Sequence, residues 1–169
     1  MGKQIIFFMD DEVEKEFFEF IKEYALVLFE DDNGLLKVID ILPNSNSVRH
    51  WRKLYIYNDK FGDYTLNDLD NGRVYLDLYK SPVIEFNRTI IRENTKDMSR
   101  GRLWFQNSYW DDEDKLVYKD PNLDKLYQKL CRWIRKNTPK VEVNAKNGVK
   151  KEYISKSLID LIESGYKIY

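Results

Sequence analysis

Two stretches near the middle of the chain, VIEFNRTIIR at Val83–Arg92 and GRLWFQNSYW at Gly101–Trp110, decide the fold that the sequence predicts. Over most of each stretch an apolar residue alternates with a polar or aromatic one, which is the two-residue period of a half-buried β-strand. The connection between them is short, so we expect the two strands to form an antiparallel hairpin.

Two similar stretches precede this hairpin, at Lys53–Asn58 and Arg73–Tyr79. Turn-rich segments that include Asn71-Gly72 and Ser81-Pro82 separate them from each other and from the hairpin. Short connections favour neighbouring antiparallel strands, so the four stretches predict a β-meander.

Helical periodicity occurs on both sides of the predicted meander. A short apolar run at Gln4–Met9 predicts a strand, after which apolar side chains recur at helical spacing from Val13 to Tyr24 with Asp11 as the expected N-cap. A second helix is expected to begin at Asp120-Pro121 and to end at Thr138-Pro139. Both helices carry an apolar stripe with which to cover one face of the sheet.

The remaining segments predict smaller elements. They are a hairpin of Ala25–Phe29 with Leu35–Leu42, a hairpin of Val141–Val143 with Val149–Tyr153, and a short helix at Ser155–Ser164. No repeat or flexible linker interrupts the pattern. We therefore expect a single α+β domain over residues 1–169, an antiparallel β-meander sheet with two main helices packed on its apolar face.

Composition limits the class of protein. With 169 residues, 43% hydrophobic and 34% charged, the chain has the size and apolar content of one packed domain. Cys131 is its one cysteine, and the apolar run at Gln4–Met9 is too short for an export signal or a membrane-spanning helix. These features predict a protein of the reducing cytoplasm with no membrane association.

Charge is unevenly distributed along the chain. Residues 1–40 hold 11 acids and 4 bases (−7), residues 41–118 hold 12 of each (0), and residues 119–169 hold 6 acids and 12 bases (+6), which sums to the net charge of −1. The acidic first helix and the basic C-terminal region are expected to be solvated faces that attract each other. The near-neutral total argues against duplex nucleic acid as a partner.

Side chains alternate across a strand, so the predicted meander has two faces. The first is apolar apart from Arg88, and its members are Leu54, Ile56, Val74, Leu76, Leu78, Ile84, Phe86, Ile90, Leu103 and Phe105. The second, here called the polar-aromatic face, holds Tyr55, Tyr57, Tyr75, Asp77, Tyr79, Glu85, Asn87, Thr89, Arg102, Trp104, Gln106, Ser108 and Trp110. A face that needs only solvation is usually rich in Lys, Glu and Thr. The polar-aromatic face therefore predicts a binding surface.

Tyr and Trp combine a large rigid surface with a hydrogen-bonding tip, and together with Arg they are enriched in binding hot spots. The candidate ligand-binding residues are Tyr75, Glu85, Asn87, Arg88, Arg102, Trp104 and Gln106. A hairpin register with Ile90 opposite Leu103 predicts that Asn87 faces Gln106 and that Thr89 faces Trp104. The segment Arg100-Gly101-Arg102, at the end of the hairpin loop, is a candidate anion-binding element.

Two structural alternatives remain open at this point. The C-terminal helix and hairpin could cover the polar-aromatic face, leaving Glu85 and Arg102 as a buried ion pair in a second core layer. Arg88 could form an ion pair with a carboxylate such as Asp77, or reach a pocket on the helix side.

The sequence contains no phosphate-binding glycine loop and no nucleophile elbow. With His50 and Cys131 as the one histidine and the one cysteine, a His/Cys zinc site is excluded, and no carboxylate spacing predicts a Mg²⁺ or Ca²⁺ site. His50 is expected at the surface or hydrogen-bonded, and Cys131 as a small buried side chain. No cofactor and no catalytic residue is predicted.

Three segments carry a resemblance to other proteins. They are SPVIEFNR at Ser81–Arg88, RGRLWF at Arg100–Phe105 and LCRWIRK at Leu130–Lys136. Together they resemble a set of small uncharacterised bacterial proteins over about the second half of the chain. The resemblance implies no activity and no catalytic residues.

The function that these features favour is binding without enzymatic turnover. The expected ligand is small and anionic, for example nucleotide-like, and is held between aromatic and arginine side chains by a sponge or sensor in conflict between phage and bacterium. The alternative is a protein–protein interaction module such as an immunity protein or inhibitor. An enzyme that uses Glu85 and Arg102 is the least favoured hypothesis, and a raised carboxylate pKa would be its signature.

Overall fold

The computed structural model describes residues 2–30, 36–38, 53–58, 83–91, 98–110, 116–119, 121–145 and 148–163. In chain order the elements are β1 (Lys3–Met9), α1 (Asp11–Tyr24), β2 (Ala25–Glu30), β3 (Leu36–Val38), β4 (Lys53–Asn58), β5 (Val83–Ile91), β6 (Met98–Gln106), β7 (Ser108–Trp110), β8 (Leu116–Lys119), α4 (Pro121–Asn137), β9 (Lys140–Ala145), β10 (Gly148–Ile154) and α5 (Lys156–Glu163). The expected α+β class is confirmed.

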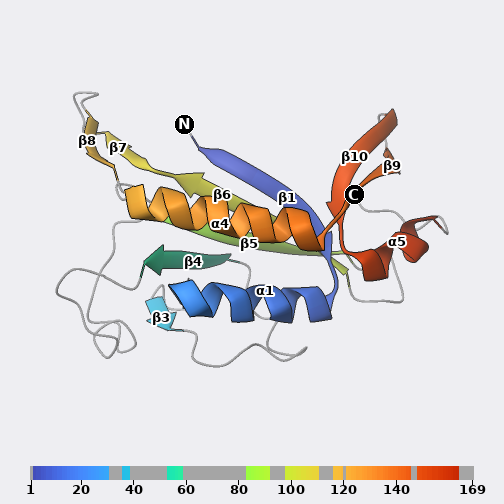
Figure 1. Ribbon diagram of the computed structural model, residues 1–169, viewed down its shortest axis with the longest axis horizontal. Coiled ribbons are helices and arrows are strands. Elements are labelled where there is room, and N and C mark those ends of the chain that lie inside the picture. Colours follow the sequence, from blue (N-terminus) through green and yellow to red (C-terminus); the bar gives the residue numbers. More distant parts are fainter. Residues whose placement is uncertain are drawn as a thin grey trace.

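Eight strands form one sheet in the order β3-β2-β4-β5-β6-β1-β10-β9, and β7 pairs with β8 in a separate two-stranded sheet (Figure 1). Strand β1 runs parallel to β10 and antiparallel to β6. The other pairs in the large sheet are antiparallel. The sheet is therefore mixed. The N-terminal strand β1 lies between the strands β3 to β6 and the two C-terminal strands β10 and β9.

The prediction of a purely antiparallel meander is wrong in three respects, of which the first is the parallel pairing of β1 with β10. Strand β4 pairs directly with β5, so the predicted succession of four neighbouring strands is broken, and the predicted strand Arg73–Tyr79 lies outside the described residues. The predicted strand Gly101–Trp110 is interrupted at Asn107, because β6 ends at Gln106 and Ser108 begins the separate β7–β8 pair. The two C-terminal strands, by contrast, pair as expected.

The apolar sequence of β1 explains its central position. Phe7 and Phe8 point to opposite faces, and both are buried. A strand that is apolar on both sides must be covered on both sides, which is the pattern of an interior strand rather than an edge strand. The run at Gln4–Met9 therefore belongs between β6 and β10.

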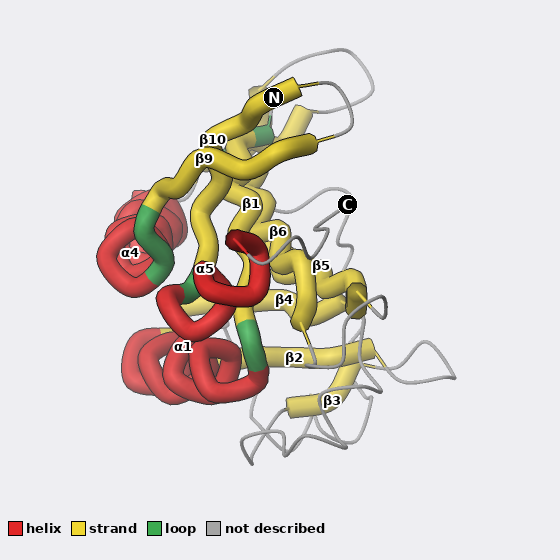
Figure 2. Tube along the Cα trace, turned by 90° about the vertical axis from the view of Figure 1, so that its right-hand side faces the viewer, coloured by secondary structure: helices red, strands yellow, loops and turns green. Residues whose placement is uncertain are grey.

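Helices α1 and α4 lie side by side over one face of the large sheet, here called the helix face (Figures 1 and 2). The N-cap of α1 is Asp10, one residue before the predicted Asp11. The Oδ1 of Asp10 accepts a 3.0 Å hydrogen bond from the Val13 amide. The hydroxyl of Ser157, just inside α5, donates to the other carboxylate oxygen of Asp10. One side chain thus connects the starts of two helices that are far apart in the sequence.

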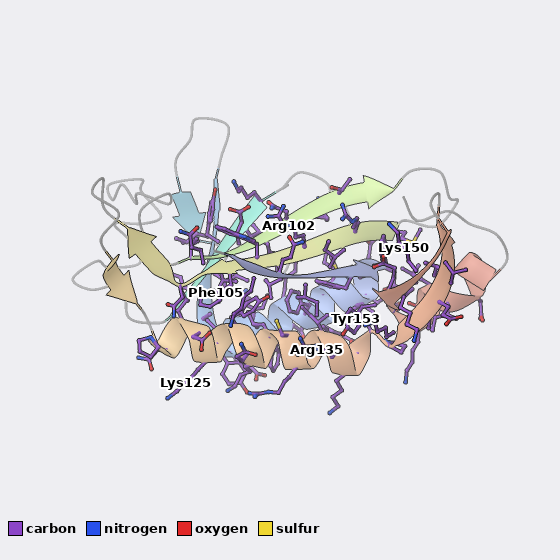
Figure 3. The ribbon with its side chains drawn as sticks, turned by 90° about the horizontal axis from the view of Figure 1, so that it is seen from above. Arg102, Phe105, Lys125, Arg135, Lys150 and Tyr153 are labelled. Atoms are coloured by element: carbon purple, nitrogen blue, oxygen red, sulfur yellow. The ribbon has the colours of Figure 1, made fainter. Side chains whose placement is uncertain are left out.

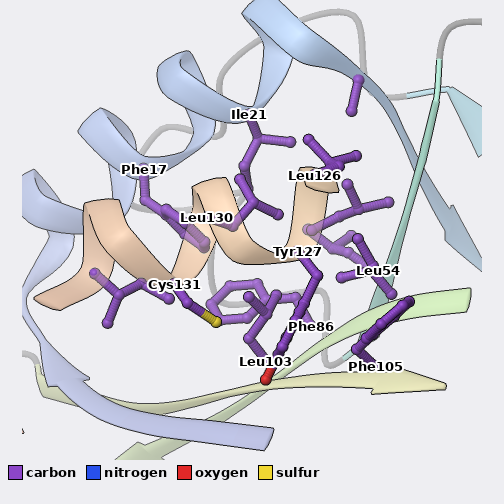
Figure 4. Packing of buried hydrophobic residues seen from close by; sticks show 14 of the residues in the cluster. Phe17, Ile21, Leu54, Phe86, Leu103, Phe105, Leu126, Tyr127, Leu130 and Cys131 are labelled. Carbon is purple, nitrogen blue, oxygen red and sulfur yellow. The ribbon is translucent and has the colours of Figure 1, made fainter. Parts of the chain in front are cut away.

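The main core lies between these two helices and the helix face, and Figure 4 shows its packing. The predicted apolar list supplies its sheet side, with Leu54, Ile56, Ile84, Phe86, Leu103 and Phe105 all buried. Phe86 and Phe17 meet edge to face with centroids 5.4 Å apart, and Phe105 stacks on Tyr127 at 4.8 Å. Each large side chain buried here stabilises the fold by roughly 1.5–3 kcal/mol. The prediction that two main helices cover the apolar face is confirmed.

A smaller cluster closes the opposite side of the sheet at one end. Phe8, Met98, Val143, Ile154 and Leu158 are its buried members. Leu158 comes from α5, and the Ser155 amide that precedes this helix donates a 2.9 Å hydrogen bond to the Phe8 carbonyl. The short helix α5 therefore covers the outward side of β1 where β1 meets β10.

Gly101 lets the sheet and its rings approach closely. A Cβ atom at this position would lie 3.0 Å from Met9 Cε and from Phe86 Cε2, and 3.1 Å from Phe7 Cζ. Atoms of a packed core give way only at a cost. The glycine of the candidate anion-binding element Arg100-Gly101-Arg102 therefore serves the packing of the core.

We expect Gly101→Ala to lower the free energy of unfolding by about 1–3 kcal/mol, because the added methyl group must displace aromatic rings on the helix face. Urea unfolding followed by circular dichroism measures this change. The neighbouring exposed residue supplies the control, since Arg100→Ala should change stability by less than about 0.5 kcal/mol. Equal stabilities of Gly101→Ala and wild type would contradict the packing role.

Candidate functional site

The register of β5 and β6 determines which candidate residues are neighbours on the polar-aromatic face. Glu85 lies opposite Trp104, and Asn87 lies opposite Arg102. The predicted pairs of Asn87 with Gln106 and of Thr89 with Trp104 are wrong, and Thr89 lies opposite Arg100 instead. The correct faces were nevertheless predicted, since a slip by an even number of residues moves partners along the strand without turning side chains over.

The same two rows continue onto the neighbouring strands. Glu85 lies opposite Tyr55 of β4, and Trp104 lies opposite Gln4 of β1. In the next row Asn87 lies opposite Lys53, and Arg102 lies opposite Ile6. The candidate residues therefore occupy the middle of the sheet, on the side away from α1 and α4 (Figure 3).

Glu85 is held by two neighbours. Its Oε1 accepts a 2.7 Å hydrogen bond from Asn87 Nδ2, and its Oε2 lies 3.4 Å from Lys53 Nζ. The alternative in which Glu85 forms a buried ion pair with Arg102 is therefore wrong. Both carboxylate oxygens are engaged, and the negative charge is balanced by Lys53.

Arg102 has a different environment. Its Nε is buried and has no hydrogen-bond partner, although the side chain as a whole is half-buried. Among the described residues, neither Arg102 nor Arg100 makes an ion pair, and both project on the polar-aromatic face because they are two positions apart on β6. A buried N–H that donates to nothing loses the full value of its hydration.

Trp104 and Gln106 complete the described part of the site. Both are half-buried, and Gln106 lies opposite Val83 at the end of β5. The indole of Trp104 has the Gly2 backbone directly against it, since a Cβ on Gly2 would come within 3.0 Å of three indole atoms. The start of β1 thus packs on this ring.

The polar region has apolar borders. Tyr55 and Leu28, opposite each other on β4 and β2, are buried on this side of the sheet, and so is Val83. At the other end the α5 cluster begins, with Ile6 partly buried against it. The polar-aromatic face is therefore covered in part. At its β1 end the covering element is the C-terminal helix α5.

Arg88 does not belong to this site. It lies on the helix face, 5% exposed, with Nη1 3.4 Å from Oε1 of the fully buried Glu14 of α1. The suggested partner Asp77 lies outside the described residues, as does the candidate Tyr75. The alternative that Arg88 forms a structural ion pair is correct, but the carboxylate comes from the first helix.

The Glu14–Arg88 pair is the strongest electrostatic feature of the helix face. Burial raises the pKa of Glu14 to about 8, against the opposing attraction of Arg88 and with a smaller contribution from Asp11. Burial likewise lowers the pKa of Arg88. Glu14 Oε2 has no hydrogen-bond partner within the part of the chain that is described. The carboxylate with the raised pKa thus lies on the face opposite the candidate ligand site.

A signal in the sequence could have identified this pair. Glu14 stands on the apolar stripe of its helix, three and four positions before Phe17 and Phe18, and Arg88 interrupts the apolar list of the sheet. Both surfaces were predicted to pack into one core. A charge buried in such a core requires an opposite charge beside it, so the two residues are expected to pair.

The remaining candidates carry no chemistry in the described structure. Cys131 is buried on α4, and burial raises the pKa of its thiol, so it remains a neutral packing residue as expected. His50 lies outside the described residues. Within the described ranges, no group of three or more His, Cys, Asp or Glu side chains is placed to hold a metal ion, and no helix is long and apolar enough to cross a membrane.

Comparisons with known proteins do not assign the chain to a family: no family model, no curated protein and no solved structure matches it.

The buried pair makes a prediction about stability. At pH values above about 8, where Glu14 is ionised, Arg88→Met alone should cost roughly 3–5 kcal/mol, because it leaves Glu14 buried without a countercharge, whereas Glu14→Leu combined with Arg88→Met should come within about 1 kcal/mol of wild type. Urea unfolding measures both. Lys53→Met provides the matched control, because its half-exposed pair with Glu85 should be worth less than about 1 kcal/mol. A double variant as unstable as the sum of the single changes would refute this account.

The pKa of Glu14 gives the pair a pH dependence. The folded protein binds this proton with a pKa of about 8 and the unfolded chain with the ordinary glutamate pKa of 4.5, so the folded state holds the extra proton between these values. Stability should therefore fall as the pH rises through this window, by up to about 1.4 kcal/mol per pH unit. Glu14→Gln should remove this slope in urea unfolding curves recorded across the window. Parallel pH profiles for wild type and Glu14→Gln would show that Glu14 is ionised throughout.

Proposed function

We propose that the polar-aromatic face of β4, β5, β6 and β1 holds a small anionic, nucleotide-like ligand, and that the protein binds this ligand without turning it over. The observation that carries the proposal is the buried, unpartnered Nε of Arg102 beside an indole. Guanidinium groups bind phosphate and carboxylate through fork-shaped pairs of hydrogen bonds. An anion at this position would supply the acceptor that Nε lacks.

The local charge supports an anionic ligand. Four charged side chains lie in the two rows and at the adjoining position of β6. Lys53 (+1) and Glu85 (−1) neutralise each other, whereas Arg100 (+1) and Arg102 (+1) remain. The sum of these four charges is +2. Without the Lys53 and Asn87 contacts, Glu85 would repel an anion, so these contacts are part of what makes the face receptive.

Trp104 supports a ligand with a planar part. It lies two positions from Arg102 on the same face, so a ring stacked on the indole would place an attached phosphate near the guanidinium group. Stacking of a base on an aromatic side chain contributes about 1–3 kcal/mol. A base and a phosphate together would thus use both features of the site.

Holding without turnover is favoured by the state of Glu85, the carboxylate of the face. Both of its oxygens are already bonded, so it is poorly placed to accept a proton from a ligand. Retention without chemistry is what a sponge or sensor does, and we propose such a role, in conflict between phage and bacterium, for this site.

Native mass spectrometry of the protein purified from the cells that make it tests the proposal first. A retained mass of a few hundred daltons that is absent from Arg102→Ala and Trp104→Ala supports it. A co-purifying protein in place of a small molecule supports the alternative, an interaction module that uses the same face.

Calorimetric titration with ADP and with inorganic phosphate then tests the chemistry. We expect ADP to bind, phosphate to bind more weakly, and Arg102→Ala and Trp104→Ala each to weaken ADP binding at least about tenfold. Arg135→Ala is the control, because this arginine is exposed on α4, on the other side of the molecule. Equal affinities of wild type, Arg102→Ala and Trp104→Ala would exclude the site.

A further inference from the structure

The outward side of α1 carries a line of acids. Glu12, Glu16, Glu19 and Glu23 are all exposed, and their spacing of four, three and four residues places them on one line along the helix. This line points away from the sheet, since the buried residues Phe17, Phe18 and Ile21 occupy the opposite side of the helix. It is called the acidic stripe below.

The outward side of α4 carries a line of bases with the same spacing. Lys125, Lys129, Arg132 and Lys136 follow one another at four, three and four residues, and all are exposed except the half-buried Lys129. Figure 3 shows Lys125 projecting from α4 away from the sheet. This is the basic stripe.

An aromatic seam separates the two stripes. Phe20 of α1 stacks on Trp133 of α4 with centroids 5.9 Å apart and meets Tyr24 edge to face at 5.1 Å. Phe20 and Trp133 are half-buried, and Tyr24 is 38% exposed. The surface thus has an apolar centre with a charged line on either side, which is the anatomy of a protein interface.

Within the described residues, the acidic stripe and the basic stripe do not neutralise each other. In the described part of the chain, no ion pair joins a residue of the acidic stripe to a residue of the basic stripe. Lys129 of the basic stripe does reach the other helix, where its Nζ lies 3.8 Å from the centroid of the Tyr24 ring. The remaining charges face outward.

The arrangement selects the partner. A phosphate backbone attracted to the basic stripe would be repelled by the acidic stripe on the adjacent helix, because packed helices lie only about 8–10 Å apart, within one Debye length at moderate salt. The partner must instead present a basic line beside an acidic line, separated by an apolar strip. A second copy of this chain has that surface.

We propose that the α1–α4 surface is the contact of a homodimer, with a two-fold axis running along the aromatic seam. Rotation about this axis places the acidic stripe of each copy over the basic stripe of the other. A two-fold axis across the helices would instead superpose stripes of like charge, so electrostatics selects the first orientation.

The contacts within one copy fix the levels along the axis. Phe20 meets Trp133 and Tyr24 meets Lys129, so the helices are antiparallel, and a pure rotation preserves position along the axis. Glu16 of one copy then comes near Lys136 of the other, and Glu23 comes near Lys129. The symmetry repeats each of these pairs.

The size of the surface sets its strength. Seventeen residues of α4 span about 25 Å. Together with the 14 residues of α1 beside it, this helix offers roughly 500 Å² of projected area per copy, below the roughly 800 Å² typical of a stable interface. The dimer should therefore be weak, with a micromolar or higher Kd, and sensitive to salt.

Sedimentation equilibrium of the full chain tests the proposal, with charge reversal as the probe. Glu16→Lys/Glu19→Lys/Glu23→Lys and Lys125→Glu/Arg132→Glu/Lys136→Glu should each self-associate at least tenfold more weakly than wild type. An equimolar mixture of the two variants should form a heterodimer, because an acidic line again meets a basic line on both sides. Raising the salt from about 0.05 M to about 0.5 M should weaken the wild-type dimer.

Lys150→Glu/Lys151→Glu is the matched control, because these exposed bases lie on β10 outside the stripes and should leave the dimer unchanged. Circular dichroism verifies that every variant is folded. A wild-type protein that stays monomeric at millimolar concentration and low salt overturns the proposal. So does a mixture of folded variants that fails to associate although wild type does.

Discussion

The constraint on which the rest of the structure depends is that β1 must be buried on both faces. Phe7 and Met9 fill the space under α1 and α4, and Phe8 fills the cluster under α5. Uncovering either face would leave one of these rows in water at a cost of several kcal/mol. Coverage on both faces suits an interior strand, and β1 lies between β6 on one side and β10 on the other.

Much of the fold could be predicted because it depends on local periodicity. The helices, the face of each strand and the apolar list from Leu54 to Phe105 follow from which side chains avoid water. Strand order and register do not follow from this, because many pairings bury the same side chains. The hairpin register was wrong for this reason: an even slip along β6 leaves Arg102 and Trp104 on the correct face with different partners.

The candidate site was predicted in composition and not in its internal connections. Glu85, Asn87, Arg102, Trp104 and Gln106 lie together as expected, but the partner of Glu85 is Lys53 of β4, opposite Asn87, and not Arg102 of β6. The sequence could have excluded Arg88 from the candidate site, because an arginine among apolar residues of a sheet requires a buried carboxylate as its partner. Glu14 was the acid on the apolar stripe of the facing helix. Local patterns identify such exceptions one at a time, whereas their pairing is a property of the tertiary fold.

The bond between Ser157 and Asp10 has a consequence for how the chain is made. These residues are 147 positions apart, and β10 immediately precedes Ser157. At a synthesis rate of about 5–20 residues per second, β1 leaves the ribosome roughly 7–30 seconds before its parallel neighbour exists. During that interval one edge of an aromatic strand is open to pairing with other chains. The strand that organises the finished sheet is thus also the part of the nascent chain most in need of protection.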